Sequence, residues 1–151
     1  MAVTMSGERV LPADKATVRA RLNDAETLKA AIPGCESLEK LSDTELQAVA
    51  KVKIGPVSAR FKGKVNLTDM DPPNSYRISG QGEGGIAGFA KGGANVRLTD
   101  AEGGGTKLSY DVDAQVGGKI AQLGSRLIDS TAKKLADEFF TNFAKALSVS
   151  S

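Results

Sequence analysis

The chain of 151 residues contains no histidine, no tryptophan and only one cysteine. The lack of histidine excludes histidine-based catalytic triads, most general-base schemes and histidine-ligated metal sites. A single thiol, Cys35, can form neither an internal disulfide nor a thiolate cage for a metal, and it agrees with a reducing compartment. The sequence therefore supplies no set of catalytic residues and no metal site.

Long apolar runs and a strong net charge are also missing. The N-terminal segment MAVTMSGERV lacks the apolar core of a signal peptide, and no run of about 18 apolar residues occurs that could span a membrane. The formal net charge is only +2 and aromatic residues make up 5% of the chain, so neither charge nor base stacking points to nucleic acid. We expect a cytoplasmic protein that does not bind nucleic acid.

The composition that remains is that of a folded domain in water. Hydrophobic residues make up 40% of the chain and charged residues 25%, which is the usual balance of a globular protein. A chain of 151 residues is long enough for one sizeable core and too short for two ordinary domains. Residues 1–151 are therefore predicted to form a single domain.

The first third of the chain combines one strand with two short helices. Residues 3–11 alternate as a strand, and a proline followed by an aspartate then opens a helix over residues 13–22. A second short helix is capped by Asn23 or Asp24 and ends at Pro33-Gly34.

From Cys35 onward the apolar positions alternate with a period of two, as in strands. Six further strands are predicted, at residues 36–41, 45–54, 57–67, 76–84, 94–98 and 108–116. Tight turns such as Asp71-Pro72-Pro73-Asn74 join them into an antiparallel meander. Residues 119 to about 147 then form one helix with an apolar stripe, roughly 43 Å long. The predicted fold class is α+β: a curved, seven-stranded antiparallel sheet around a long C-terminal helix, with two short helices between strands 1 and 2.

Turns at one end of this sheet carry apolar side chains where polar ones are usual. In a meander, successive turns alternate between the two ends, so Gly55-Pro56, residues 84–92 and Gly117-Gly118 share one end. Many inward positions are also small, which indicates either close approach of the long helix or a ligand cavity. The residues predicted to bind a hydrophobic ligand are Ile54, Pro56, Phe61, Tyr76, Gly84, Ile86, Phe89, Tyr110, Ile120, Leu123 and Leu127.

The glycine-rich stretch GQGEGGIAGFAKGG, residues 80–93, is not a phosphate-binding loop. It has no Gly-Lys-Ser or Gly-Lys-Thr ending, and it joins two strands instead of opening a helix. Its first glycines are small inward positions, whereas residues 85–92 are predicted to be a flexible connection that carries Ile86 and Phe89 at the mouth of the pocket.

Basic side chains gather on the outward face of the predicted strands. This face is either an ordinary solvated surface or a docking surface for an acidic protein or for anionic lipid headgroups. The residues predicted for docking are Lys51, Lys53, Arg60, Lys62 and Lys64.

Several segments, in order along nearly the whole chain, carry a resemblance to a known family. They are Gly7-Glu8-Arg9 with Leu11-Pro12, residues 31–36 (AIPGCE), residues 52–57 (VKIGPV), Phe61 with Gly63, Asp71-Pro72-Pro73, residues 85–92 (GIAGFAKG), and Gly117-Gly118-Lys119 followed by Leu123-Gly124. Together they resemble the CoxG family of carbon monoxide dehydrogenase subunits. That family belongs to the START-like (SRPBCC) helix-grip superfamily, whose sheet and long helix often enclose a hydrophobic ligand.

The resemblance implies a non-catalytic accessory protein of a carbon monoxide dehydrogenase-type molybdenum hydroxylase, which aids electron transfer to the membrane or recruitment there. It implies binding of a respiratory quinone, menaquinone or ubiquinone, or of a lipid, and no covalent cofactor. Longer members end in a membrane anchor, whereas this chain stops at Ser148-Val149-Ser150-Ser151, so we expect a cytoplasmic protein with at most peripheral contact at the inner face of the cell membrane. A polyketide cyclase or aromatase, and a ligand-free maturation adaptor, are the alternatives.

Overall fold

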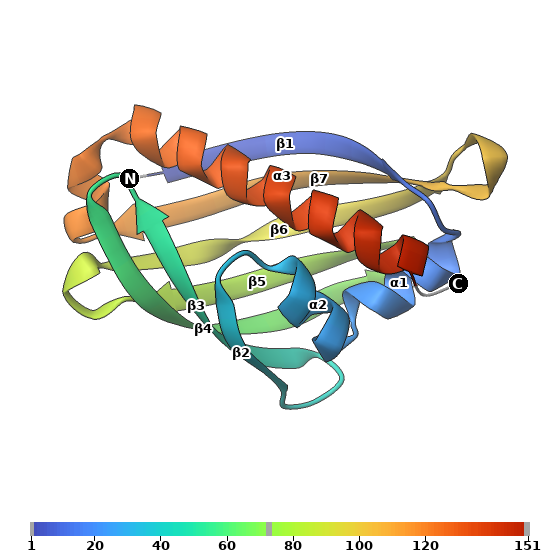
Figure 1. The fold of residues 1–151 in the computed structure, drawn as a ribbon, viewed down its shortest axis with the longest axis horizontal. Helices are drawn as coiled ribbons and strands as arrows, with labels where there is room; N and C mark the ends of the chain where they lie inside the picture. Colours follow the sequence, from blue (N-terminus) through green and yellow to red (C-terminus); the bar gives the residue numbers. More distant parts are fainter. Residues whose placement is uncertain (1, 72–73, 150–151) are drawn as a thin grey trace.

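The computed structural model describes residues 2–71 and 74–149 and shows one curved sheet around a long helix (Figure 1). The strands are β1 (Ala2–Leu11), β2 (Cys35–Lys40), β3 (Glu45–Ile54), β4 (Val57–Asp71), β5 (Ser75–Glu83), β6 (Phe89–Asp100) and β7 (Thr106–Gly117). The helices are α1 (Lys15–Leu22), α2 (Ala25–Ala31) and α3 (Ser125–Val149), with short 3-10 helices η1 (Gly85–Ala87), η2 (Glu102–Gly104) and η3 (Lys119–Leu123). The predicted fold class is confirmed; Pro72 and Pro73 of the predicted turn lie outside the described residues.

The sheet is antiparallel throughout, in the order β1-β7-β6-β5-β4-β3-β2. Strands β2 to β7 form the predicted meander, and β1 joins it beside β7, with Ala2 opposite Gln115 and Leu11 opposite Thr106. Helices α1 and α2 follow β1 and lead the chain to β2, at the other edge of the sheet (Figure 1).

Aspartate caps begin both short helices. The Asp14 carboxylate accepts a hydrogen bond from the backbone N–H of Thr17 at 2.8 Å, so α1 begins at Lys15 and not at residue 13 as predicted. The Asp24 carboxylate accepts from the Thr27 backbone N–H at 3.2 Å and from the Thr27 hydroxyl at 2.6 Å. Such bonds satisfy donors that a first helical turn leaves open, and they settle the choice of cap for α2 in favour of Asp24.

The C-terminal helix begins later than predicted. Residues Lys119–Leu123 form the 3-10 helix η3, and Gly124 then takes φ +95°, which interrupts the helical backbone before Ser125. The prediction of one continuous helix from residue 119 is wrong because a residue in this region cannot continue an α-helix. Helix α3 has 25 residues, about 37 Å in length, and it still crosses the sheet (Figure 1).

The β5–β6 connection is shorter than the predicted one. Strand β6 begins at Phe89, which pairs with Glu83 of β5 and with Gly117 of β7. Only Gly84 to Gly88 form the connection, so most of the segment 85–92 is strand and not a loop. The paired backbone on both sides of Phe89 extends the sheet further than the glycine content suggested.

The hydrophobic core has two parts along the length of α3. The main core includes Leu11, Val18, Leu98, Leu108 and Phe143, which are 0–2% exposed. A second group packs at the end of the sheet that carries the β3–β4 turn, η1 and η3, which we term the loop end. This loop-end cluster consists of Val3, Ala87, Val116, Ile120 and Ile128, with Ile54, Val57, Ala59, Phe61, Ala90, Ala114 and Ala121 packed against it.

Candidate functional site

A cavity of about 300 Å³ lies between the concave face of the sheet and the helices. All seven strands and α1, α2 and α3 contribute to its lining. Apart from two tyrosines, every side chain that the structure places in this lining is aliphatic, methionine or phenylalanine. The cavity is thus an apolar compartment inside the grip of sheet and helix.

Small side chains leave this space open. Ala48 of β3, Ala94 of β6 and Ala136 of α3 line the cavity from facing elements, so three methyl groups stand where longer side chains would fill the core. The glycine Gly84 has another function, because a Cβ built there would lie 2.7 Å from the Phe61 ring. Both predicted uses of small residues occur, in different parts of the sheet: one leaves a cavity and the other admits a packed ring.

Two tyrosine hydroxyls give the cavity its polar atoms. Tyr76 is 4% exposed, and the Arg19 guanidinium lies over its ring at 4.9 Å from the centroid. Burial raises the pKa of Tyr76 well above its ordinary value, so the side chain stays neutral. Tyr110 stacks on Phe140 with ring centroids 5.2 Å apart. Each hydroxyl can donate one hydrogen bond to an oxygen of a bound molecule.

The cavity offers binding and little acid–base chemistry. None of the described residues in its lining is a carboxylate, lysine or arginine. Within residues 2–71 and 74–149, no group of three or more histidine, cysteine, aspartate or glutamate side chains could hold a metal ion. Burial raises the pKa of the Cys35 thiol, which keeps it from forming a nucleophilic thiolate.

The structure separates the residues predicted to bind the ligand. Tyr76 and Tyr110 line the cavity. Three others, Ile54, Phe61 and Ile120, belong to or pack on the loop-end cluster. The remaining six, none of which is among the residues lining the cavity, lie at the loop end or next to it: Pro56, Gly84, Ile86, Phe89, Leu123 and Leu127. Entry of a ligand at the loop end stays a prediction.

Several lining residues were not predicted, although the pattern contains their signal. Leu46 and Val65 occupy inward positions in the middle of β3 and β4, where alternation points to the core without distinguishing core from cavity. Phe139 was part of the predicted apolar stripe of the long helix, and Phe140 follows it at the start of the last turns over the sheet. No local signal marks Leu28 of α2, because its place in the lining depends on how α2 packs on α3.

A polar groove of about 640 Å³ runs between β1 and α3, next to the cavity. Met5 and Tyr110 line both spaces and therefore form the partition between them. On the groove side, the Arg9 guanidinium pairs with Asp137 and lies 5.7 Å from the centroid of the Phe140 ring. Gly7 makes room for the partition, because a Cβ there would lie 2.6 Å from the Tyr110 hydroxyl oxygen.

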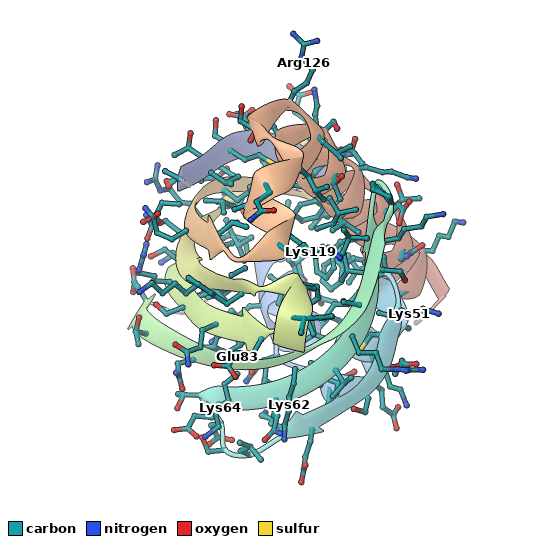
Figure 2. The ribbon with its side chains drawn as sticks, turned by 90° about the vertical axis from the view of Figure 1, so that its left-hand side faces the viewer. Lys51, Lys62, Lys64, Glu83, Lys119 and Arg126 are labelled. Atoms are coloured by element: carbon teal, nitrogen blue, oxygen red, sulfur yellow. The ribbon has the colours of Figure 1, made fainter. Side chains whose placement is uncertain are left out.

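The residues predicted for docking are all exposed on the outer face of β3 and β4. Figure 2 shows Lys51, Lys62 and Lys64 directed away from the sheet. The Arg60 guanidinium instead donates to the Glu36 carboxylate at 2.6 Å, which raises the pKa of Arg60. Among the described residues, no ion pair involves Lys51, Lys53, Lys62 or Lys64, so these four charges remain available.

The arrangement of a curved seven-stranded sheet, a long C-terminal helix and an enclosed apolar cavity defines the START-like class of proteins. A START superfamily protein from Mycobacterium smegmatis superposes on 98% of this chain and 99% of its own, with TM-score 0.73 and 14% identity. The Zhui aromatase/cyclase from Streptomyces sp. R1128 covers 98% and 94%, with TM-score 0.71 and 10% identity. Both likenesses establish the fold alone.

Within this class, the chain belongs to the CoxG family of carbon monoxide dehydrogenase subunits, whose model matches residues 7–148. A conserved protein from Geobacillus kaustophilus is 31% identical, with TM-score 0.91 over 98% of this chain and 97% of that one. A search of curated protein sequences finds no match. No helix in the described part of the chain is both long and apolar enough to cross a bilayer.

Proposed function

We propose that this protein is a non-catalytic accessory subunit that binds a hydrophobic small molecule for a carbon monoxide dehydrogenase-type molybdenum hydroxylase. The observation that carries the proposal is the enclosed apolar cavity with two tyrosine hydroxyls. Family membership supports the partner, since the family is described as a subunit of carbon monoxide dehydrogenase.

A respiratory quinone, menaquinone or ubiquinone, suits such a cavity. A quinone ring is apolar and flat, and its two carbonyl oxygens accept hydrogen bonds of the kind that Tyr76 and Tyr110 can donate. The volume of about 300 Å³ lies at the lower end of the range for small-molecule sites, so the ring and the start of its chain fill it. The rest of a long isoprenoid chain requires the Met5–Tyr110 partition or the loop-end cluster to open.

The absence of converging charged groups in the described lining argues for carriage and against turnover. A cyclase-like enzyme, the alternative, would have to rely on Tyr76 and Tyr110 alone. A ligand-free adaptor, the other alternative, would leave the cavity without a purpose. The proposed location is the cytoplasm, with exchange of ligand at the inner face of the cell membrane.

Extraction of the purified protein with organic solvent and titration with short-chain quinone analogues test the proposal. Saturable binding stabilises the fold by about 2.7 kcal/mol at a ligand concentration 100 times Kd, which a thermal melt detects. We expect Tyr110→Phe and Tyr76→Phe to weaken binding by roughly two- to tenfold, the value of one hydrogen bond. A matched control is Thr99→Val, an exposed position on β6 outside the cavity.

Two outcomes would contradict the proposal. Without copurified lipid and without saturable quinone binding, the cavity would have no such ligand. Turnover of a polyketide-like substrate that disappears in Tyr110→Phe would favour the cyclase. Charge reversal at Lys62 and Lys64 addresses the adaptor separately, because it should leave quinone binding unchanged whatever it does to association with the enzyme.

A further inference from the structure

Two of the most exposed apolar side chains sit together on the β5–β6 connection. Ile86 is 91% exposed and Phe89 is 42% exposed. The other exposed large hydrophobic residues in the described chain are Val10, at 69%, and Leu41, at 42%, and both lie toward the opposite end of the sheet. Single exposed apolar residues are common, but a pair of them at one protruding turn forms an apolar tip, which we define as Ile86 and Phe89.

The turn that carries this tip is anchored. Ala87, next to Ile86, is 4% exposed and belongs to the loop-end cluster. The Gly84 N–H donates to the Gly88 carbonyl at 2.8 Å, and Gly88 adopts φ +120° so closely against β7 that a Cβ would lie 2.1 Å from the Gly117 carbonyl oxygen. Ile86 is therefore held outward by packed backbone and is not left over from a loose loop.

Basic side chains surround the tip. Figure 2, which views the molecule from the loop end, shows Lys119 near the middle, Arg126 at one side, and Lys51, Lys62 and Lys64 along the other side. We term these five residues the basic rim. Glu83 is the acidic side chain labelled among them (Figure 2). None of the five forms an ion pair with any described residue.

The charges are distributed unevenly over the molecule. The turns at the far end carry Asp43, Asp100 and Glu102, which are exposed, and two of these pair with lysines. The loop end instead collects cations that form no ion pair with any described residue. A net charge of only +2 thus conceals one basic end, and a charged surface of one sign attracts a surface of the opposite sign.

We propose that the loop end docks on an anionic lipid bilayer, with Ile86 inserted among the headgroups, Phe89 at their level and the basic rim against the phosphates. Each lysine or arginine near an anionic membrane contributes about 1 kcal/mol, and buried apolar area adds to this. A bilayer is favoured over a protein partner because a stable protein interface buries roughly 800 Å² on each side, whereas two apolar side chains on a protruding turn offer a point of insertion. The inference uses the proposed function only for its purpose, the exchange of ligand with a membrane.

The lack of tryptophan supplies a direct probe of insertion. In the full chain without quinone, Ile86→Trp introduces a single indole at the tip, and Val10→Trp introduces one at the opposite end as a matched control. With vesicles of phosphatidylcholine and phosphatidylglycerol at low salt, we expect a blue shift of fluorescence for Ile86→Trp and none for Val10→Trp. Vesicles of pure phosphatidylcholine should bind neither, because the basic rim has no counterpart there.

Flotation with the same anionic vesicles gives the energetic test. Ile86→Ser combined with Phe89→Ser should weaken binding roughly tenfold or more, whereas Val10→Ser combined with Leu41→Ser should leave it unchanged. Lys119→Glu combined with Arg126→Glu should weaken it as well, and raised salt should release the native chain.

The proposal is overturned if the native chain does not float with anionic vesicles at low salt, or if the tip and control variants float equally well. It is also overturned if the tip variants keep vesicle binding and lose association with the hydroxylase, which would make the loop end a protein-docking surface. Quinone titration of the tip variants separates this result from the proposed function, because the cavity does not include Ile86 or Phe89.

Discussion

Two tyrosines and no tryptophan make the ultraviolet absorbance of this chain a report on its cavity. Burial raises the pKa of Tyr76, so the native state keeps a proton that the unfolded state loses near pH 10. The native state then binds more protons, and stability falls as pH rises above about 10. We predict that urea melts show a steeper alkaline loss of stability for the native sequence than for Tyr76→Phe. Tyr76 phenolate absorbance with native circular dichroism would contradict this.

The cap residue Asp24 sets a stability difference at the acidic side. The hydrogen bond from the Thr27 hydroxyl is the main cause that lowers the pKa of Asp24. Its contribution is present above the ordinary aspartate pKa and is lost as pH falls through the lowered native value. We expect Asp24→Ala to cost about 1 kcal/mol at pH 7 and progressively less below about pH 4.

Chemical denaturation at neutral and acidic pH measures this effect. Asp43→Ala is the matched control, because its carboxylate is fully exposed and lies 3.9 Å from the Lys40 ammonium, a contact of little energetic value. Equal losses for Asp24→Ala and Asp43→Ala would mean that the cap does not stabilise α2.

At the scale of elements, α3 divides between core and cavity. Phe143 is 0% exposed and packs in the main core, so Phe143→Ala should cost about 3–5 kcal/mol. Phe139 is half-buried and borders the cavity, so its ring makes fewer contacts that truncation can remove. We expect Phe139→Ala to cost clearly less and to admit bulkier quinone analogues. Thermal melts and ligand titration of both variants test this; equal destabilisation would show that the cavity is not open beside Phe139.

The elements were predictable where one local pattern determines them. Alternation in segments such as residues 45–54 places every second side chain on one face whatever its surroundings, and the strands follow. The start of α3 was not predictable from periodicity, because Ile120 and Leu123 fit a helical stripe while the backbone of Gly124 breaks it. The strand start at Phe89 depends on pairing with both β5 and β7, which no property of the glycine-rich segment encodes.

At the scale of the whole molecule, the class of site was predictable and its position was not. Alternation placed Tyr76 and Tyr110 inside, and the small inward residues indicated missing volume. Hydrophobicity also marked Ile54, Phe61 and Ile120, but it does not say whether a buried side chain faces a ligand or another side chain. In the structure these three pack with the loop-end cluster, and the open volume lies where α2, α3 and the middle of the sheet meet.

The position of β1 beside β7 has a consequence for how the chain reaches this structure. Partners such as Leu11 and Thr106 are roughly a hundred residues apart in sequence, and pairing over such a distance slows folding. The first strand to leave the ribosome must therefore wait for nearly the whole chain before it can pair. We predict that β1 amides gain protection last when refolding is followed by pulsed hydrogen exchange; protection of β1 together with the β3–β4 hairpin would contradict this. Until β1 docks, the edge of β7 stays open, and this folding intermediate is the one most exposed to pairing with another chain.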